Sequence, residues 1–471
     1  MLTNRASWSV LGKLFAGLLI VMLFACAESS AQDFKGKGKQ PDFIPAGYDD
    51  YQNMLDQLGI TKMRKGRDSK VKDTSAEATA HPFKESMPDL MTFKDGTKVK
   101  SPDQWPKRRA EIVEDFEREV YGRVPKNVPK VKWEVVSTVE GESGGIAIVT
   151  KTLVGHVDNS AFPKIKVAIQ ASFTVPKYAA GKVPIFIQFG GGFGFGGKGG
   201  GISWQQQALN KGWGYGTINP GSVQGDNNQL RQGIIGLTNK GEPRRPDDWG
   251  ALRAWAWGVS CLIDYFEANP DSGVDATKVS ITGVSRYGKA ALVAAAFETR
   301  IAAGFVASSG AGGAKLFRRE FGELLENVAS RGEYHWMAGN YLKYGAEEAK
   351  FGKKTAADLP VDQHQLIALC APRLCFISYG IPAKGDPNWV DAPGSFQAAV
   401  LAGPAYRLLG KKDLGTKGDY LTDKLPAVNT LIGGELAWRQ HDGGHTNIPN
   451  FPDFYEWAGK YISTPGLVKK K

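Results

Sequence analysis

A serine between two glycines is the residue of this chain best suited to nucleophilic chemistry. Residues 279–284 are rich in β-branched side chains, Ser285 follows them, and an alanine-rich run at helical spacing comes next. This pattern predicts a strand, a sharp turn and a helix, an arrangement that holds a serine hydroxyl exposed at the end of a sheet. Gly283 and Gly288 leave room for the turn, although Tyr287 replaces the glycine that commonly lies two residues after such a serine. The alternative is a tight turn in which the serine only caps a helix.

A serine nucleophile needs a base, and two late histidines are placed to supply it. His441 and His445 lie in a glycine-containing loop that precedes the last helical pattern. Chains with a strand, serine and helix of this kind usually have the order serine, acid, histidine. The two glycines directly before His445 favour it over His441 as the base. Two ordinary surface histidines are the alternative.

The acid that orients the histidine is expected after the strand pattern at residues 374–379. Asp386 and Asp391 follow that strand. Either carboxylate could hold the imidazole in the correct tautomer and stabilise its cation. Asp386 comes first and is flanked by turn residues, so we prefer it as the acid. Asp391 remains the alternative acid. The other aspartate would be a turn residue or a helix cap.

The elements that must position these residues alternate along the chain. Apolar strand patterns alternate with helical patterns. This alternation predicts a mostly parallel sheet with helices on both faces, which is a three-layer α/β sandwich of the α/β-hydrolase type. A charged and aromatic stretch at residues 317–350 is expected to be a helical insertion over the site. Strands are expected at 146–154, 165–173, 183–189, 215–218, 304–307 and 374–379, and helices at 105–120 and 249–266.

The start of the chain predicts export. Residues 1–31 have basic residues, a short apolar run and a small-residue end, which is the layout of a signal peptide. The protein is therefore expected to be secreted or periplasmic, with lipid attachment at Cys26 as a variant. Residues 32–100 are expected to be a linker or a wrapping arm, and residues 101–465 the catalytic domain.

Composition limits the partners. The formal net charge is +11, and the basic residues are spread along the chain without an interleaved aromatic array. We therefore do not expect binding to nucleic acid. We expect a weak electrostatic attraction to acidic polysaccharide. The cysteines and histidines do not have zinc spacing, and we expect no metal and no organic cofactor. Beyond the leader, Cys261, Cys370 and Cys375 are expected to be buried thiols, with a Cys370–Cys375 bridge as the alternative.

Residues 283–289 also carry a resemblance to a known family. Their sequence, Gly-Val-Ser-Arg-Tyr-Gly-Lys, is similar to the Gly-Cys-Ser-Arg-x-Gly-Lys signature of the glucuronoyl esterases, carbohydrate esterase family 15. The resemblance extends over about residues 184–461. It implies a serine esterase that hydrolyses esters of 4-O-methyl-glucuronic acid or glucuronic acid, as in lignin–carbohydrate linkages of glucuronoxylan, and that needs no cofactor.

The resemblance implies a role for five residues. Ser285 is similar to the nucleophile, and Arg286 to the residue whose backbone amide and guanidinium hold the oxyanion. Lys289 resembles the residue that binds the sugar hydroxyls, and Trp389 the residue that borders the sugar. Glu323 lies where bacterial members place a sugar-binding glutamate. Glu320 and Glu326 are alternatives on the same stretch.

One position departs from the family pattern. Many members take the acid from a glutamate directly before a Ser-Gly-x-Gly-Gly loop, and this chain has Ser308 there. The resemblance therefore moves the acid to the later loop, to Asp386 or Asp391. An acetyl or feruloyl xylan esterase and a catalytically silent polysaccharide-binding protein are the alternative functions, and Arg286 with Lys289 favours the uronate. We expect a monomer.

Overall fold

The protein is described by a computed structural model over residues 40–70, 80, 86–190 and 202–467. The expected signal peptide, with Cys26, lies outside these residues. Phe43 to Lys471 form one compact unit, to which the following description refers. Within the described ranges, no helix has the length and apolar character needed to cross a membrane.

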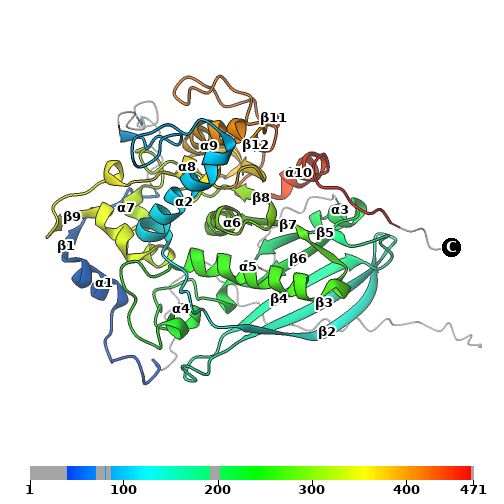
Figure 1. Ribbon diagram of the computed structural model, residues 1–471, viewed down its shortest axis with the longest axis horizontal. Coiled ribbons are helices and arrows are strands. Elements are labelled where there is room, and N and C mark those ends of the chain that lie inside the picture. Colours follow the sequence, from blue (N-terminus) through cyan, green and yellow to red (C-terminus); the bar gives the residue numbers. More distant parts are fainter. Residues whose placement is uncertain (1–39, 71–79, 81–85, 191–201, 468–471) are drawn as a thin grey trace, which may run out of the picture. The chain divides into compact units, whose positions relative to one another are not determined.

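A ten-stranded sheet is the frame of this unit (Figure 1). The strand order is β11-β12-β10-β8-β7-β5-β6-β4-β3-β2. The six strands from β12 to β6 run parallel, and antiparallel strands extend the sheet at both ends. The strands are β2 (Val131–Ser143), β3 (Ile146–Val157), β4 (Ala168–Pro176), β5 (Val183–Phe189), β6 (Gly214–Ile218), β7 (Val274–Val284), β8 (Ile301–Ala307), β10 (Leu374–Tyr379), β11 (Leu431–Gly433) and β12 (Leu436–Gln440).

Helices cover both faces because the central strands are apolar on both sides. On one face, Phe186, Phe305 and Phe376 pack with α3 and α10, and the Phe305 and Phe454 rings stack with centroids 5.1 Å apart. Alternate strand residues such as Ile187 join the core on the other face, where α5 and α6 lie (Figure 1). The helices are α2 (Trp105–Phe116), α3 (Trp204–Asn210), α4 (Gly233–Thr238), α5 (Ala251–Ala268), α6 (Arg286–Phe297), α8 (Gln363–Ala368), α9 (Ala392–Leu408) and α10 (Phe451–Ala458).

These elements confirm the predicted fold class and most predicted strands. The antiparallel pair expected at residues 146–154 and 165–173 is β3 with β4. The stretch 317–350 is less helical than expected, with the short helix α7 (Leu325–Val328) and two 3-10 segments, η7 (Tyr334–Trp336) and η8 (Gly339–Gly345). Glycines interrupt it: Gly322 has φ 61°, which helical residues do not adopt.

The stretch before residue 100 also contains regular structure. Helix α1 (Asp50–Leu58) is capped at its N-terminus by Asp49, whose carboxylate accepts a hydrogen bond from the Gln52 amide, and at its C-terminus by Gly59 in the left-handed conformation. Strand β1 (Ile60–Met63) then pairs antiparallel with β9 (Ala346–Ala349). This pairing attaches the segment to the stretch at 317–350.

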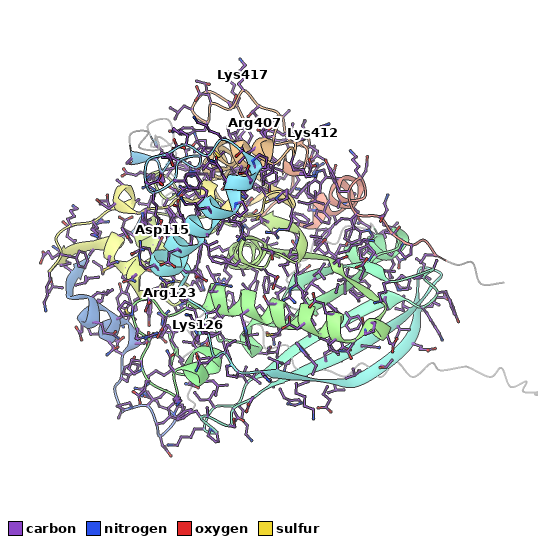
Figure 2. All side chains as sticks on the ribbon, in the orientation of Figure 1. Asp115, Arg123, Lys126, Arg407, Lys412 and Lys417 are labelled. Atoms are coloured by element: carbon purple, nitrogen blue, oxygen red, sulfur yellow. The ribbon has the colours of Figure 1, made fainter. Side chains whose placement is uncertain are left out.

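Cys261, Cys370 and Cys375 are free and buried. In Figure 2, Lys412 and Lys417 lie apart from Lys126.

Candidate active site

The site lies where neighbouring parallel strands end. Strands β7, β8, β10 and β12 are adjacent in the sheet, and each is followed by one of the predicted site segments. Ser285 follows β7, Ser308 follows β8, Asp386 follows β10 and His445 follows β12. Because these strands run parallel, their carboxyl ends share one edge of the sheet, which is where such sheets bind ligands.

Ser285 occupies a strained turn between β7 and α6. Its backbone has φ 61° and ψ −129°, and its amide donates to the Ala307 carbonyl at 3.0 Å. A Cβ added to Gly283 would lie 2.2 Å from the Tyr287 carbonyl oxygen, and one added to Gly288 would lie 2.4 Å from the Ala307 carbonyl oxygen. Both positions therefore require glycine, and the turn has the geometry of a nucleophile elbow.

His445 and Asp386 form a hydrogen-bonded pair. His445 Nδ1 lies 2.7 Å from Asp386 Oδ1. The second carboxylate oxygen, Oδ2, accepts from the Ser308 hydroxyl at 2.7 Å and from the Gly380 amide at 2.6 Å. Asp386 is 2% exposed, so these contacts fix a buried carboxylate. With Nδ1–H donating to Asp386, Nε2 of His445 is the nitrogen that can accept a proton.

The two alternative residues have other partners. His441 Nε2 donates to the Thr446 carbonyl at 2.8 Å, and its Nδ1 accepts from the Gly443 amide at 2.9 Å, so both ring nitrogens hold the loop. Burial lowers the pKa of His441, which keeps it neutral. Asp391 is fully buried and accepts from Arg319 Nε at 2.9 Å. It also caps α9 through the Gly394 amide.

Arg286 is the first residue of α6, and its guanidinium forms an ion pair with Asp226. Nη1 donates to Asp226 Oδ2 at 2.7 Å, and the guanidinium carbon lies 5.5 Å from the centroid of the Trp336 ring. The arginine side chain is 43% exposed. The guanidinium is therefore restrained at Nη1 while the side chain stays partly exposed.

Lys289, one helical turn after the serine, forms a buried ion pair with Glu323. Its ammonium lies 2.7 Å from Glu323 Oε2 and 2.6 Å from the Ala311 carbonyl. Glu323 Oε2 also accepts from the Ala311 amide at 2.8 Å. The Glu323 amide in turn donates to the Trp389 carbonyl at 2.8 Å. The three residues expected to bind the sugar thus lie next to one another, with Glu323 in the loop before α7.

The structure adds residues that the sequence analysis did not assign to the site. Asp226 lies in the loop before α4, and His335 and Trp336 lie in η7. Glu333 is half-buried, and burial together with the charge of Glu323 raises its pKa to about 8. Its Oε2 has no hydrogen-bond partner among the described residues. The sequence offered only a weak signal, the aromatic run at 334–336.

The arrangement supports acyl transfer through a serine. In the part of the chain that the structure describes, histidine, cysteine and carboxylate side chains do not gather into a metal-binding group. A serine on a strained strand-to-helix turn, with an aspartate–histidine pair at the ends of neighbouring parallel strands, is typical of the α/β-hydrolases. This is the class of protein that the fold and the site define.

Comparisons with known proteins narrow the class. A family model described as "Glucuronyl esterase, fungi" matches residues 163–410. A carbohydrate esterase from an unknown prokaryotic organism is 33% identical over 422 residues, covering 81% of this chain and 90% of that protein. A 4-O-methyl-glucuronoyl methylesterase from Hypocrea jecorina is 28% identical over 337 residues, covering 69% of this chain and 62% of that protein.

Solved structures agree with these matches. A CE15 glucuronoyl esterase from Teredinibacter turnerae superposes with a TM-score of 0.78 at 38% identity, covering 87% of this chain and 98% of that one. The chain belongs to the glucuronoyl esterase family, carbohydrate esterase family 15. It is a carboxylic ester hydrolase, as the resemblance at residues 283–289 predicted.

Proposed function

We propose that this protein is an exported glucuronoyl esterase that hydrolyses esters of 4-O-methyl-glucuronic acid or glucuronic acid, as in the lignin–carbohydrate linkages of glucuronoxylan. Its relatives include enzymes named 4-O-methyl-glucuronoyl methylesterases. The observation that carries the mechanism is the 2.7 Å contact between His445 Nδ1 and Asp386 Oδ1 at the sheet edge where Ser285 sits at φ 61°.

The reaction proceeds in two steps. Ser285 Oγ attacks the uronate carbonyl while His445 Nε2 takes the hydroxyl proton, and the tetrahedral intermediate expels the alcohol, which receives that proton. Water then attacks the acyl-enzyme with the same histidine as base, and the histidine returns this proton to Ser285 Oγ as the bond to the serine breaks and the uronic acid leaves. Asp386 stabilises the imidazolium in both steps. The Arg286 guanidinium stabilises the oxyanion, where a fixed positive charge is worth several kcal/mol.

Lys289, Glu323 and Trp389 form the sugar subsite in this proposal. An ammonium has three N–H groups, and among the described residues two of those of Lys289 have partners, Ala311 and Glu323. The third is left for a sugar hydroxyl. Trp389 is half-buried and borders the sugar with its ring. An acetyl group would use none of these contacts, so they favour a uronate over an acetyl or feruloyl ester.

A burst assay with benzyl glucuronate tests the chemistry. Wild-type enzyme should release benzyl alcohol and form an acyl-enzyme, whereas Ser285→Ala should fold with an unchanged melting temperature and lose turnover. A catalytically silent binding protein would bind the ester without release. Turnover at the wild-type rate in the alanine variant would refute the mechanism.

The sugar subsite is tested by substrate choice. Lys289→Ala should raise KM for benzyl glucuronate much more than for a small acetyl ester, because only the uronate offers ring hydroxyls to the ammonium. The double variant Lys289→Ala with Glu323→Gln is the control, since it does not leave a buried carboxylate unpaired. Equal losses on both esters in both variants would make the pair structural and weaken the uronate assignment.

A further inference from the structure

The Arg286 guanidinium is held by the carboxylate of Asp226, whose other partners among the described residues are two ring nitrogens. Asp226 Oδ2 accepts from Arg286 Nη1 at 2.7 Å. The other oxygen, Oδ1, accepts from His335 Nε2 at 2.9 Å and from Trp336 Nε1 at 2.7 Å. Oδ1 of Asp226 therefore accepts from two ring nitrogens, and Oδ2 accepts from the arginine.

The two rings make a fixed support. His335 is 3% exposed and Trp336 is 4% exposed, and they come from η7, far along the chain from the loop of Asp226. Burial lowers the pKa of His335 against the opposing effect of Asp226, and its Nδ1 has no hydrogen-bond partner among the described residues. A neutral ring with its proton on Nε2 satisfies both observations. Planar buried rings have little freedom, so the carboxylate they hold has one orientation.

Burial alone would raise the pKa of Asp226, but the hydrogen bond from His335 and the charge of Arg286 outweigh it and lower the pKa. The carboxylate is thus ionised at working pH. A flexible arginine has rotamer entropy, which an ionised partner in a fixed orientation removes before substrate arrives. Trp336 also restrains the same guanidinium, since its ring centroid lies 5.5 Å from the guanidinium carbon.

We propose that Asp226, held by His335 and Trp336, is a positioning residue that aims the Arg286 guanidinium at the oxyanion of the reaction. This inference rests on the proposed function, in which Arg286 stabilises that oxyanion. Among the described residues Nη1 is the guanidinium nitrogen with a partner, so Nε and Nη2 are left to donate to the substrate oxygen. The nearby negative charge weakens the field of the arginine, and fixed geometry offsets this cost because catalytic hydrogen bonds depend on position.

The variant Asp226→Asn tests the inference. Its amide oxygen can still accept from the two rings, but its NH2 group then faces Nη1, which can only donate. The guanidinium should lose its fixed position, so kcat on benzyl glucuronate should fall roughly 10–100-fold. KM should stay within about twofold, because the contact acts on the transition state and not on ground-state binding. Asp248→Asn is the matched control: Asp248 is also a largely buried aspartate, paired with Arg245 at 3.1 Å, and we place it outside the site.

A double-mutant cycle separates positioning from a general structural role. If Asp226 acts through Arg286, then Asp226→Asn should cost less than about threefold in an Arg286→Ala background, because the group it positions is gone. Ethylguanidinium should restore part of the activity of Arg286→Ala, and restore none in the double variant. Melting temperatures of all variants show that they are folded.

The outcomes distinguish this inference from the proposed function. Full activity of Arg286→Ala would refute the role of the arginine itself. A large loss in Arg286→Ala combined with no loss in Asp226→Asn, or with losses that add in the double variant, would refute the positioning role alone. A rise in kcat in Asp226→Asn would also overturn it, since the carboxylate would then only be weakening the arginine.

Discussion

Among the described residues, three hydrogen bonds reach the two oxygens of Asp386, and these contacts determine what each substitution there should do. His445 occupies Oδ1, while Ser308 and Gly380 occupy Oδ2. An asparagine in this place would turn its NH2 group toward one of these donors, and a backbone amide such as that of Gly380 cannot accept in return. Asp386→Asn should therefore keep the fold and lose on the order of 10²–10⁴ in kcat, as expected when the histidine loses its tautomer and its counter-charge.

Asp391→Asn is the control for this prediction. Asp391 is paired with the buried Arg319 and caps α9, so its loss should cost stability, about 3–5 kcal/mol for a broken buried ion pair. The kcat of the molecules that remain folded should stay near that of the wild type. Strong loss of kcat in folded Asp391→Asn together with an active Asp386→Asn would reverse the assignment of the acid.

Ser308→Glu on the Asp386→Asn background extends the test. The Ser308 hydroxyl is 2.7 Å from Asp386 Oδ2, so a carboxylate built from position 308 starts beside the acid that it would replace. Partial recovery of kcat would show that both positions reach His445 Nδ1. A folded double variant without recovery would mean that the turn at Ser308, with φ 42°, directs the longer side chain elsewhere.

At the scale of elements, β1 connects the stretch before residue 100 to the part of the chain that carries Glu323. Arg64, directly after β1, donates to Glu326 Oε1 at 2.8 Å and to the Lys354 carbonyl at 2.8 Å, and its side chain is 15% exposed. Arg64→Met leaves the Glu326 carboxylate and the Lys354 carbonyl without this partner. The free energy of unfolding in urea should fall by about 3 kcal/mol, as for a largely buried ion pair.

Lys62→Met is the matched control. Lys62 lies in β1, two residues before Arg64, and pairs with Glu348 at 3.3 Å, but both side chains are 61% exposed. An exposed pair of this kind contributes less than about 1 kcal/mol. Equal effects of the two substitutions would show that the β1 segment is held by its backbone pairing with β9 and not by Arg64.

The elements differ in how well the sequence predicts them. The apolar run of β5 and the strand, turn and helix around Ser285 were predictable because burial on both faces leaves a continuous apolar pattern. Strand β2 was missed because most of its residues are exposed, and the alternation of apolar and polar side chains, present at residues 131–135, stops at the register shift between Val135 and Ser137. Helix α1 was missed although its sequence carries a helical signal: Tyr51, Met54, Leu55 and Leu58 have helical spacing between the caps Asp49 and Gly59.

The site follows the same logic. The positions of Ser285, His445 and Asp386 at the ends of the sheet strands were predictable because each follows a recognisable strand or glycine loop. Asp226 was not, because it is 60 positions from Arg286 and 109 positions from His335, and only the folded chain brings the three together. Lone polar residues in loops do not carry a local pattern.

At the scale of the whole molecule, buried titratable groups make the free energy of unfolding depend on pH. His364 in α8 is 1% exposed, and its Nε2 donates to the Pro88 carbonyl at 3.0 Å. It thereby ties the sheet-covering helices to the segment that precedes α2. Burial lowers the pKa of His364 to about 4, against the opposing charge of Asp362 and with a smaller contribution from Arg318 and Arg108.

The last prediction follows from this pKa. The ordinary pKa of histidine is 6.5, so between about pH 6.5 and pH 4 the unfolded chain binds a proton at His364 that the folded chain does not. The free energy of unfolding must therefore fall as the pH falls through this window, by at most about 1.4 kcal/mol per pH unit from this one group. His364→Gln keeps a donor for the Pro88 carbonyl and cannot titrate, so its stability should depend less on pH there. Urea unfolding at several pH values between 4 and 8 measures the difference between the two proteins, and His156→Gln, at an exposed histidine, should follow the wild type. If the wild type and His364→Gln lose stability in parallel, His364 is not the group that limits the fold at acid pH.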